Sequence, residues 1–286
     1  MEMDRKAIVF GYTLSAKKLY EEIEKKYEIV AFCDNDKDKW GEAEYGNKLK
    51  VADPTLIFEI QWDEIIIISL SSMNIIKKQL LDMGVNENKI NTSYIDFQVR
   101  AREVFLRDYA AIVYDLNISG CVAEAGVFQG EFASIINESF PDRKLYLFDT
   151  FEGFDERDIK FEAQNSFSNA AKGQLSLTSE SLVLKKMKYP DNCIICKGYF
   201  PESAKNVKEQ FVFVNLDMDL YKPTLEGLRF FYPLMVKGGI IVIHDFFSKG
   251  YEGINAALKE FTEEIKNKKI TPFPIGDHVS IAIQKG

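Results

Sequence analysis

The sequence predicts an α/β protein with two domains, each built around a mostly parallel sheet. Short apolar runs alternate with segments of helical periodicity along most of the 286 residues. A strand–glycine turn–helix–strand unit occurs near the amino terminus and again from Gly120 to Phe154. In both units the second strand ends in an acidic residue, Asp34 and Asp149. This arrangement is typical of Rossmann-like domains, which bind ligands at the carboxyl edge of the sheet.

Composition and charge narrow the classes of function. The chain is 46% hydrophobic and 28% charged, which is ordinary for a soluble globular protein. A net charge of −8 argues against a nucleic-acid-binding protein, which normally carries a basic face. No apolar run approaches the roughly 18 residues of a membrane span, and we see no signal peptide, so we expect a cytoplasmic protein. The four cysteines are expected to be free core thiols beside buried strands, Cys33, Cys121, Cys193 and Cys196.

The first domain is expected to cover residues 1–92. Its predicted elements are a strand at Ala7–Phe10, a helix at Ser15–Lys26 with Leu19, Tyr20 and Ile23 inward, strands at Ile29–Cys33 and Glu64–Leu70, and a helix at Met73–Met83. Its turn, GYTLSA, keeps Gly11 but has Thr13 and Ala16 where a dinucleotide fingerprint has glycines. Docking or sugar-nucleotide recognition is therefore favoured here over binding of a dinucleotide cofactor.

The second domain is expected to cover residues 93–286. One or two helices should precede Gly120. Strands are predicted at Cys121–Ala125, Lys144–Phe148, Cys193–Cys196, Phe211–Leu216 and Ile240–Ile243. Helices are predicted to begin at Pro201 and to cover Tyr221–Tyr232 and Ile254–Ile265. A terminal hairpin is predicted at Thr271–Pro274 and Val279–Gln284. The polar segment Asp155–Asn192 is too long for a plain connection and suits a lid or substrate wall. Its Phe161 and Phe167 would either line a pocket or pin the loop.

A nucleoside half-site is predicted at the first turn of the second domain. Gly126 closes the strand, and Gly130 precedes the helix. Glycine allows close approach of a ligand to the backbone, and a carboxylate at Asp149 can accept both hydroxyls of a ribose. The E-x-G-x-x-x-G spacing lacks the tight three-glycine fingerprint, so a pyrophosphate is not indicated.

Acidic side chains follow two further strands. Asp217 and Asp219 come after one strand, and His244 and Asp245 after the next. One crossover separates these strands, so their ends should be adjacent, and clustered carboxylates repel unless a cation sits among them. Oxygen ligands with open positions suit Mg²⁺. The alternative is that Asp217 caps a helix and His244 bonds a backbone carbonyl; two adjacent clusters favour the metal.

The order EAGVFQG, LFDTFEGF, KGYFPES, LDMDLYKPTLEGLRFFYPLMVKGGIIVIHDF and GINAALKEF resembles the macrocin O-methyltransferase family over about residues 100–286. The resemblance implies a class I methyltransferase domain with a seven-stranded, mostly parallel sheet, S-adenosylmethionine as cofactor, a divalent metal, and sugar hydroxyls as acceptors. It implies that Glu124, Gly126 and Gly130 shape the turn at the methionine end, Asp149 holds the ribose, Thr150 and Phe151 flank the nucleoside, and Asp217 and Asp245 bind Mg²⁺. His244 stands where that family usually has an acid.

The expected function is Mg²⁺-assisted, S-adenosylmethionine-dependent O-methylation of a sugar, a sugar nucleotide or a sugar-containing metabolite. Asp219 is the first candidate for the base and His278 the second, and His244 is a candidate third metal ligand. The helix around Phe105–Tyr114 could serve as a contact surface in a homo-oligomer. The alternatives are an NAD-dependent sugar oxidoreductase or epimerase, which the degraded first turn disfavours, and a non-catalytic scaffold, which the intact acids at three strand ends disfavour.

Overall fold

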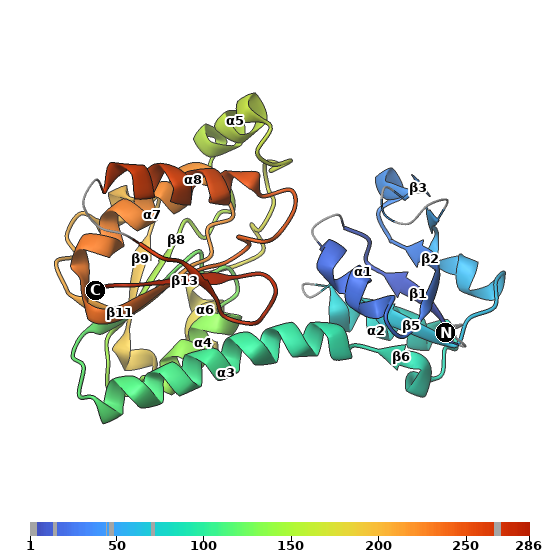
Figure 1. The fold of residues 1–286 in the computed structure, drawn as a ribbon, viewed down its shortest axis with the longest axis horizontal. Helices are drawn as coiled ribbons and strands as arrows, with labels where there is room; N and C mark the ends of the chain where they lie inside the picture. Colours follow the sequence, from blue (N-terminus) through green and yellow to red (C-terminus); the bar gives the residue numbers. More distant parts are fainter. Residues whose placement is uncertain (1–4, 14–15, 44, 46–48, 70–71, 266–269) are drawn as a thin grey trace. The chain divides into compact units, whose positions relative to one another are not determined.

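The computed structural model describes residues 5–13, 16–43, 45, 49–69, 72–265 and 270–286. Contacts between residues divide the chain into two compact units, Met1–Arg100 and Ala101–Gly286. The division falls inside one long helix, α3 (Ser93–Asp115), and the boundary predicted near residue 93 is the start of that helix (Figure 1). The expected helix start at Ser15 and strand end at Leu70 lie outside the described residues.

The first unit contains a six-stranded sheet in the order β3-β4-β2-β1-β5-β6, in which only the β3–β4 pair is antiparallel among the described residues. Its elements are β1 (Lys6–Phe10), α1 (Lys17–Ile23), β2 (Glu28–Cys33), β3 (Gly41–Glu42), β4 (Lys50–Ala52), β5 (Glu64–Ile67), α2 (Met73–Asp82) and β6 (Ile90–Asn91). The inward positions predicted for α1 are confirmed, since Leu19, Tyr20 and Ile23 are buried. After their first residues, Lys6 and Glu64, strands β1 and β5 are continuous apolar runs of buried side chains, as is typical of strands covered on both faces.

The second unit contains the predicted seven-stranded, mostly parallel sheet, in the order β12-β13-β11-β10-β7-β8-β9. Its strands are β7 (Cys121–Ala125), β8 (Leu145–Asp149), β9 (Cys193–Lys197), β10 (Phe211–Leu216), β11 (Met235–Ile243), β12 (Phe273–Pro274) and β13 (Ile281–Gln284). The terminal hairpin adds β13 antiparallel to β11, as expected. The strand order reverses between β7 and β10, and such a reversal opens a crevice at the carboxyl edge.

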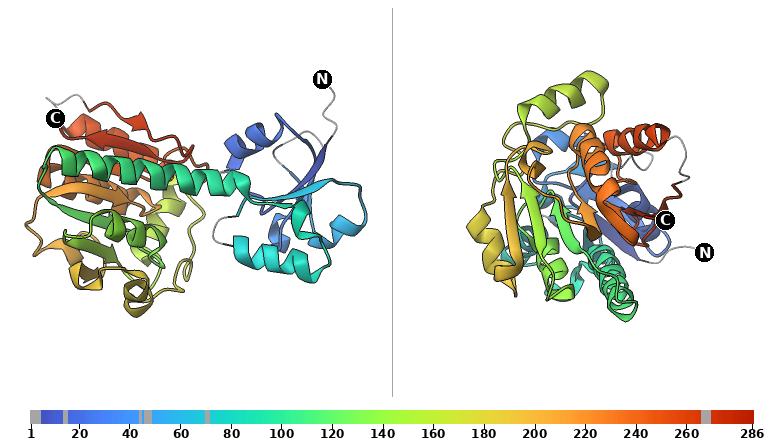
Figure 2. Two further views of the ribbon diagram at one scale, coloured as in Figure 1. Left: turned by 90° about the horizontal axis from the view of Figure 1, so that it is seen from below. Right: turned by 90° about the vertical axis from the view of Figure 1, so that its left-hand side faces the viewer.

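Two hydrophobic cores cover the faces of this sheet (Figures 1 and 2). Helices α7 (Tyr221–Leu234) and α8 (Glu252–Glu264) pack on one face over strand side chains such as Phe148 and Val214. Helices α3, α4 (Glu131–Ser139) and α6 (Glu180–Lys186) pack on the other face over Val122 and Phe213. Because helices pack on both faces of the sheet, the strand ends and the loops that follow them are held in fixed positions.

The long insertion between β8 and β9 forms α5 (Glu156–Asn165) and α6. Phe161 stacks on the ring of Tyr221 with centroids 5.1 Å apart, and Phe167 lies 5.2 Å from the same ring. The buried carboxylate of Glu162 accepts a hydrogen bond of 2.8 Å from the backbone N–H of Tyr221, which opens α7. Of the two alternatives for the aromatic pair, the structure shows that both rings pin the insertion to the start of α7.

One predicted element is wrong. Instead of a helix beginning at Pro201, the segment makes a single 3₁₀ turn at Glu202–Ala204 before β10. Ala204 and Val207 are the only apolar side chains in its sequence ESAKNVKEQ, too few for a continuous apolar stripe that would hold a longer helix to the sheet.

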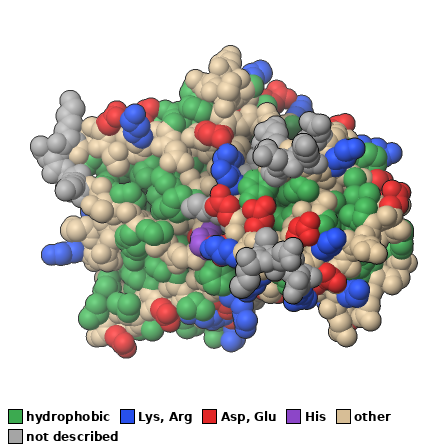
Figure 3. Space-filling model, turned by 45° about the vertical axis from the view of Figure 1, so that its right-hand side comes forward, with side chains coloured by type: hydrophobic (Ala, Val, Ile, Leu, Met, Phe, Trp, Pro, Cys, Tyr) green, Lys and Arg blue, Asp and Glu red, His purple; other side chains and the backbone are tan. Residues whose placement is uncertain are grey.

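On the face drawn in Figure 3, acidic and basic side chains are intermingled, with hydrophobic side chains between them. No helix in the described part of the chain is long and apolar enough to cross a membrane.

Candidate active site

Asp149, at the end of β8, holds the glycine turn after β7. Its Oδ2 accepts hydrogen bonds from the backbone N–H groups of Val127 and Phe128 at 2.8 and 2.9 Å. Its Oδ1 accepts a third bond of 2.7 Å from the N–H of Phe151. The side chain predicted to hold a ribose therefore also fixes the shape of the turn.

The two glycines of this turn are required for different contacts. A Cβ on Gly126 would lie 1.9 Å from the carbonyl oxygen of Asp217, and its φ is +86°. A Cβ on Gly130 would lie 3.0 Å from the side chain of Val183 on α6, and its φ of +82° places it in the left-handed region as the N-cap of α4. Gly126 thus allows the turn to pack against the end of β10, where the second cluster begins.

The loop after Asp149 is held by its own hydrogen bonds. The Thr150 hydroxyl donates a bond of 2.7 Å to the carbonyl of Gly153. Phe151 is buried and has a φ of +55°, which is a strained value for an aromatic residue. Both residues predicted to flank a nucleoside therefore lie directly after the turn-holding carboxylate.

Glu124 and Asn215 face each other in the centre of the sheet. They are register partners on β7 and β10, exposed by 2% and 0%. The Asn215 amide donates to Glu124 Oε1 at 2.8 Å, while Glu124 Oε2 and Asn215 Oδ1 have no hydrogen-bond partner among the described residues. Burial raises the pKa of the Glu124 carboxyl to about 8, although the positive charge of Arg102 acts in the other direction.

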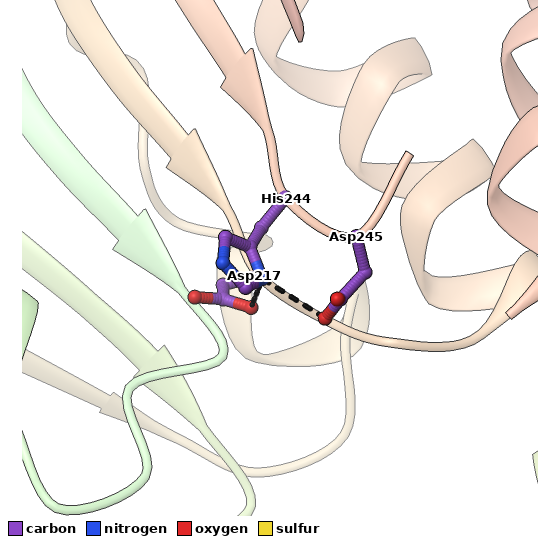
Figure 4. Close-up of side chains that lie close together, drawn as sticks. All are labelled: Asp217, His244 and Asp245. Atoms are coloured by element: carbon purple, nitrogen blue, oxygen red, sulfur yellow. Dashed lines mark hydrogen bonds and ion pairs between the residues drawn. The ribbon is translucent and has the colours of Figure 1, made fainter. Parts of the chain in front are cut away.

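Asp217, His244 and Asp245 come together as predicted from the ends of adjacent strands (Figure 4). The His244 Nδ1 atom lies 3.0 Å from Asp217 Oδ1 and 2.9 Å from Asp245 Oδ2. One ligand atom from each residue lies within 4.8 Å of the others, a spacing compatible with one metal ion. Among the described residues this is the one group of three or more such side chains.

The charges in this cluster balance one another. Burial disfavours ionisation of Asp217, but the positive charges of His244 and Arg102 hold the pKa of its carboxyl below the ordinary value. Burial also opposes the charge on His244, yet Asp217 and Asp245 raise the pKa of its imidazole well above the usual range. For Asp219, burial and then the carboxylates of Asp245 and Asp217 raise its pKa well above the usual range.

The two base candidates lie in different surroundings. Asp219 adjoins the cluster, where the negative charge of Asp245 acts on its carboxyl, and both residues have positive φ, +61° and +54°. His278 lies on the exposed turn before β13, with φ of +63°, and is not one of the three clustered residues. Backbone strain of this kind persists where the surrounding structure fixes it, often at functional sites.

Arg102 is a residue of the site that sequence analysis missed. It lies on α3, and its guanidinium sits 3.7 Å from the ring centroid of Phe132 in the first turn of α4. Its Nη2 atom contacts Asp217 Oδ2 at 3.2 Å, and its side chain is 13% exposed. No local pattern marks it, because its partners lie far along the chain.

Comparison with known proteins identifies the second unit. The family model described as macrocin-O-methyltransferase matches residues 82–280, more than half of the chain. The chain belongs to this family. A second model, described as C2185-like, N-terminal, matches residues 3–91. As a family member, the chain is an S-adenosylmethionine-dependent O-methyltransferase, as the sequence predicts.

Solved structures share the fold. The O-methyltransferase NovP superposes with a TM-score of 0.53 at 19% identity, over 65% of this chain and 79% of NovP. CalS11, described as a calicheamicin methyltransferase, gives a TM-score of 0.51 at 16% identity, over 76% of this chain and 92% of its own. At these identities the likeness shows the fold. A search of proteins with curated functions finds no match.

Proposed function

We propose that this enzyme methylates a hydroxyl group of a sugar, a sugar nucleotide or a sugar-containing metabolite, with assistance from Mg²⁺. The observation that carries the proposal is the meeting of two sites at one sheet edge: the Asp149 turn after β7 and β8, and the cluster after β10 and β11. Family membership supports the methyl donor. NovP is described as an O-methyltransferase and CalS11 as a calicheamicin methyltransferase, which supports a natural-product acceptor.

The residues of the first turn fit the methyl donor. Asp149 would hold the ribose, with Thr150 and Phe151 beside the nucleoside, while Gly126 and Gly130 keep the backbone close. When bound, S-adenosylmethionine supplies an activated methyl group on a sulfonium. The protein's contribution is alignment of the acceptor oxygen with that methyl group and exclusion of water, and alignment of this kind is worth about 7–11 kcal/mol.

The cluster fits a divalent cation. Asp217 and Asp245 offer the carboxylate oxygens that Mg²⁺ prefers, and His244 offers a nitrogen to the same point. The bound ion would lower the pKa of an acceptor hydroxyl. The Nδ1 contacts of the imidazole to both carboxylates bring the three groups together, and ligation of the ion would replace these contacts.

The proton of the acceptor hydroxyl needs a base, and we assign this role first to the Asp219 carboxylate. It adjoins Asp245 at the cluster and comes from the same strand end as Asp217. His278 remains the second candidate, at the exposed turn before β13.

For the first unit, docking or recognition of a sugar nucleotide remains our proposal. A homo-oligomer formed through α3 also remains a prediction. The exposed side chains of Val104 and Ile112, 55% and 51% accessible, lie on this helix within the second unit.

The decisive experiment is isothermal titration of S-adenosylhomocysteine into the purified full chain, with and without Mg²⁺. We expect one site per chain with micromolar affinity. Methyl transfer is then measured by mass spectrometry on a panel of nucleotide-linked sugars. Absence of binding under both conditions would refute the donor site, and binding without transfer to any sugar would refute the proposed acceptor class. A thermal shift with NAD⁺ tests the oxidoreductase alternative, because a ligand of the native state raises Tm.

A further inference from the structure

Two buried acceptor atoms in the second unit lack a donor. Glu124 Oε2 and Asn215 Oδ1 are buried at the point where the strand order reverses, and no described residue donates to either. Leaving a buried polar atom unpaired costs about 1–3 kcal/mol, so native structures rarely keep one without a reason. Alternation along the strands places both side chains on the face that carries Val122 and Phe213, which is covered by α3 and α4.

A cation with unused donors lies on the same face. The guanidinium of Arg102 carries five N–H donors, and among the described residues one of them donates a hydrogen bond, to Asp217 at 3.2 Å. Packing against the face of Phe132 holds the group at the first turn of α4. Asp217, which it contacts, follows Asn215 by two residues at the end of β10, and Asn215 is the register partner of Glu124, so the guanidinium lies at the same end of these strands as the two unpaired acceptors.

Two backbone amides of the glycine turn already have an acceptor. The N–H groups of Val127 and Phe128 donate to Asp149, so these two amides are not available to an anionic group of a ligand. An anion that enters next to this turn cannot use these two amides, and the guanidinium of Arg102 offers it a cation at the first turn of α4.

We propose that Arg102 binds the carboxylate of the methionine moiety of the methyl donor, while Glu124 and Asn215 accept hydrogen bonds from its ammonium group. The proposal rests on the proposed function, since it assigns the amino-acid end of the same ligand. An α-amino acid carries both charges a few ångströms apart, so its carboxylate would pair with the guanidinium while its ammonium would favour the ionised form of the buried Glu124 carboxyl. A fork-shaped, two-bond contact to the ligand carboxylate would be stronger than the single contact to Asp217.

The test compares two ligands that share the nucleoside and differ in the amino-acid end. S-Adenosylhomocysteine carries the zwitterion, and 5′-deoxy-5′-methylthioadenosine lacks it. We expect Arg102→Gln to weaken S-adenosylhomocysteine binding about 10- to 100-fold by titration calorimetry, and to change methylthioadenosine binding less than about twofold. Arg107→Gln is the matched control on the same helix, because its side chain is 44% exposed and pairs with Glu103 and Glu138; it should bind both ligands as the wild type does.

Arg102→Lys keeps the charge beside Glu124 and removes the fork, which guards against a folding defect in the glutamine variant. We expect it to bind S-adenosylhomocysteine with intermediate affinity and to melt within a few degrees of the wild type. Equal losses for both ligands would assign Arg102 a purely structural role, and unchanged affinity would remove it from the site; either result overturns the proposal. If the wild type binds neither ligand, the proposed function fails, and this inference fails with it.

Discussion

The two units contain the same backbone motif, and their first turns are built alike. Gly11 donates its N–H to the carbonyl of Cys33 at 2.8 Å, and Gly126 donates to the carbonyl of Phe148 at 2.9 Å. Both glycines have positive φ, +98° and +86°. The glycine turn is therefore a requirement of the strand–helix connection, and it does not identify a ligand site by itself.

The acids after the second strands differ in what they bind. Asp34 is 7% exposed, accepts from the N–H of Asp36 at 2.9 Å, and pairs with Lys39 at 3.0 Å. These partners lie in the loop that follows it. Asp149 instead binds backbone N–H groups of the glycine turn itself. In the second unit, turn and acid form one preorganised structure.

The space around the turns differs as well. In the first unit, Tyr12 and Tyr20 pack on Phe32 with centroids 4.9 and 5.0 Å away, and the Tyr20 hydroxyl donates to the carbonyl of Thr13 at 2.7 Å. All three buried, unpartnered side-chain oxygens found among the described residues lie in the second unit. Around the glycine turn of the first unit, the unit's own side chains fill the space and pair the polar groups described there. The second unit retains unpaired polar groups that suit a ligand.

The largest expected effect is a loss of stability on substitution of Gly126, where the glycine turn packs against the end of β10. Gly126→Ala would place a Cβ 1.9 Å from a backbone oxygen of Asp217, so we expect loss of more than about 4 kcal/mol of stability. Gly11→Ala meets the Ser69 side chain at 2.8 Å and should cost less, about 2 kcal/mol. Hydrogen exchange measured by mass spectrometry on each unit separates these effects. Wild-type protection in the Gly126 variant would contradict the close packing.

The next effect concerns turnover. Asp245→Asn removes one charge from the cluster, while asparagine tolerates the φ of +54° at this position. We expect methyl transfer to fall about 1,000-fold and Mg²⁺ binding to weaken, with S-adenosylhomocysteine affinity unchanged within about threefold. Steady-state kinetics measures turnover, and titrations with Mg²⁺ and with S-adenosylhomocysteine measure the two affinities. Asp36→Asn in the first unit is the control. Full turnover of the Asp245→Asn variant in chelator-treated buffer would exclude a metal-binding role for Asp245.

A smaller loss is expected for donor affinity at Asp149. Asp149→Ala removes the acceptor for the Val127 and Phe128 amides together with the proposed ribose contact, so S-adenosylhomocysteine should bind about 100-fold more weakly. Calorimetry measures the affinity, and circular dichroism checks the fold. Wild-type affinity would refute the ribose assignment.

The sequence predicted the parts of the site that follow from strand topology. Asp217 and Asp245 could be placed together because the ends of adjacent parallel strands meet at one edge. Arg102 could not, since it precedes Asp217 by 115 residues and depends on how α3 packs across the sheet. The hydrogen bond that Glu162 accepts from the Tyr221 N–H could not be predicted for the same reason. Long-range side-chain convergence depends on packing, which leaves no local pattern.

The smallest expected effect is a decrease in Tm on substitution of Asp34, the acid of the first unit that corresponds to Asp149. Asp34→Asn keeps an acceptor for the Asp36 N–H and removes the charge paired with Lys39, whose side chain is 41% exposed. A partly exposed ion pair contributes about 1 kcal/mol or less, so we expect a Tm decrease of a few degrees confined to the first unit. S-Adenosylhomocysteine affinity should not change, because in the described part of the chain the hydrogen bond and the ion pair accepted by this carboxylate both come from the loop that follows it. A drop in that affinity comparable to the Asp149 variant would mean that the first turn contributes to donor binding, and the functional division between the two units would be wrong.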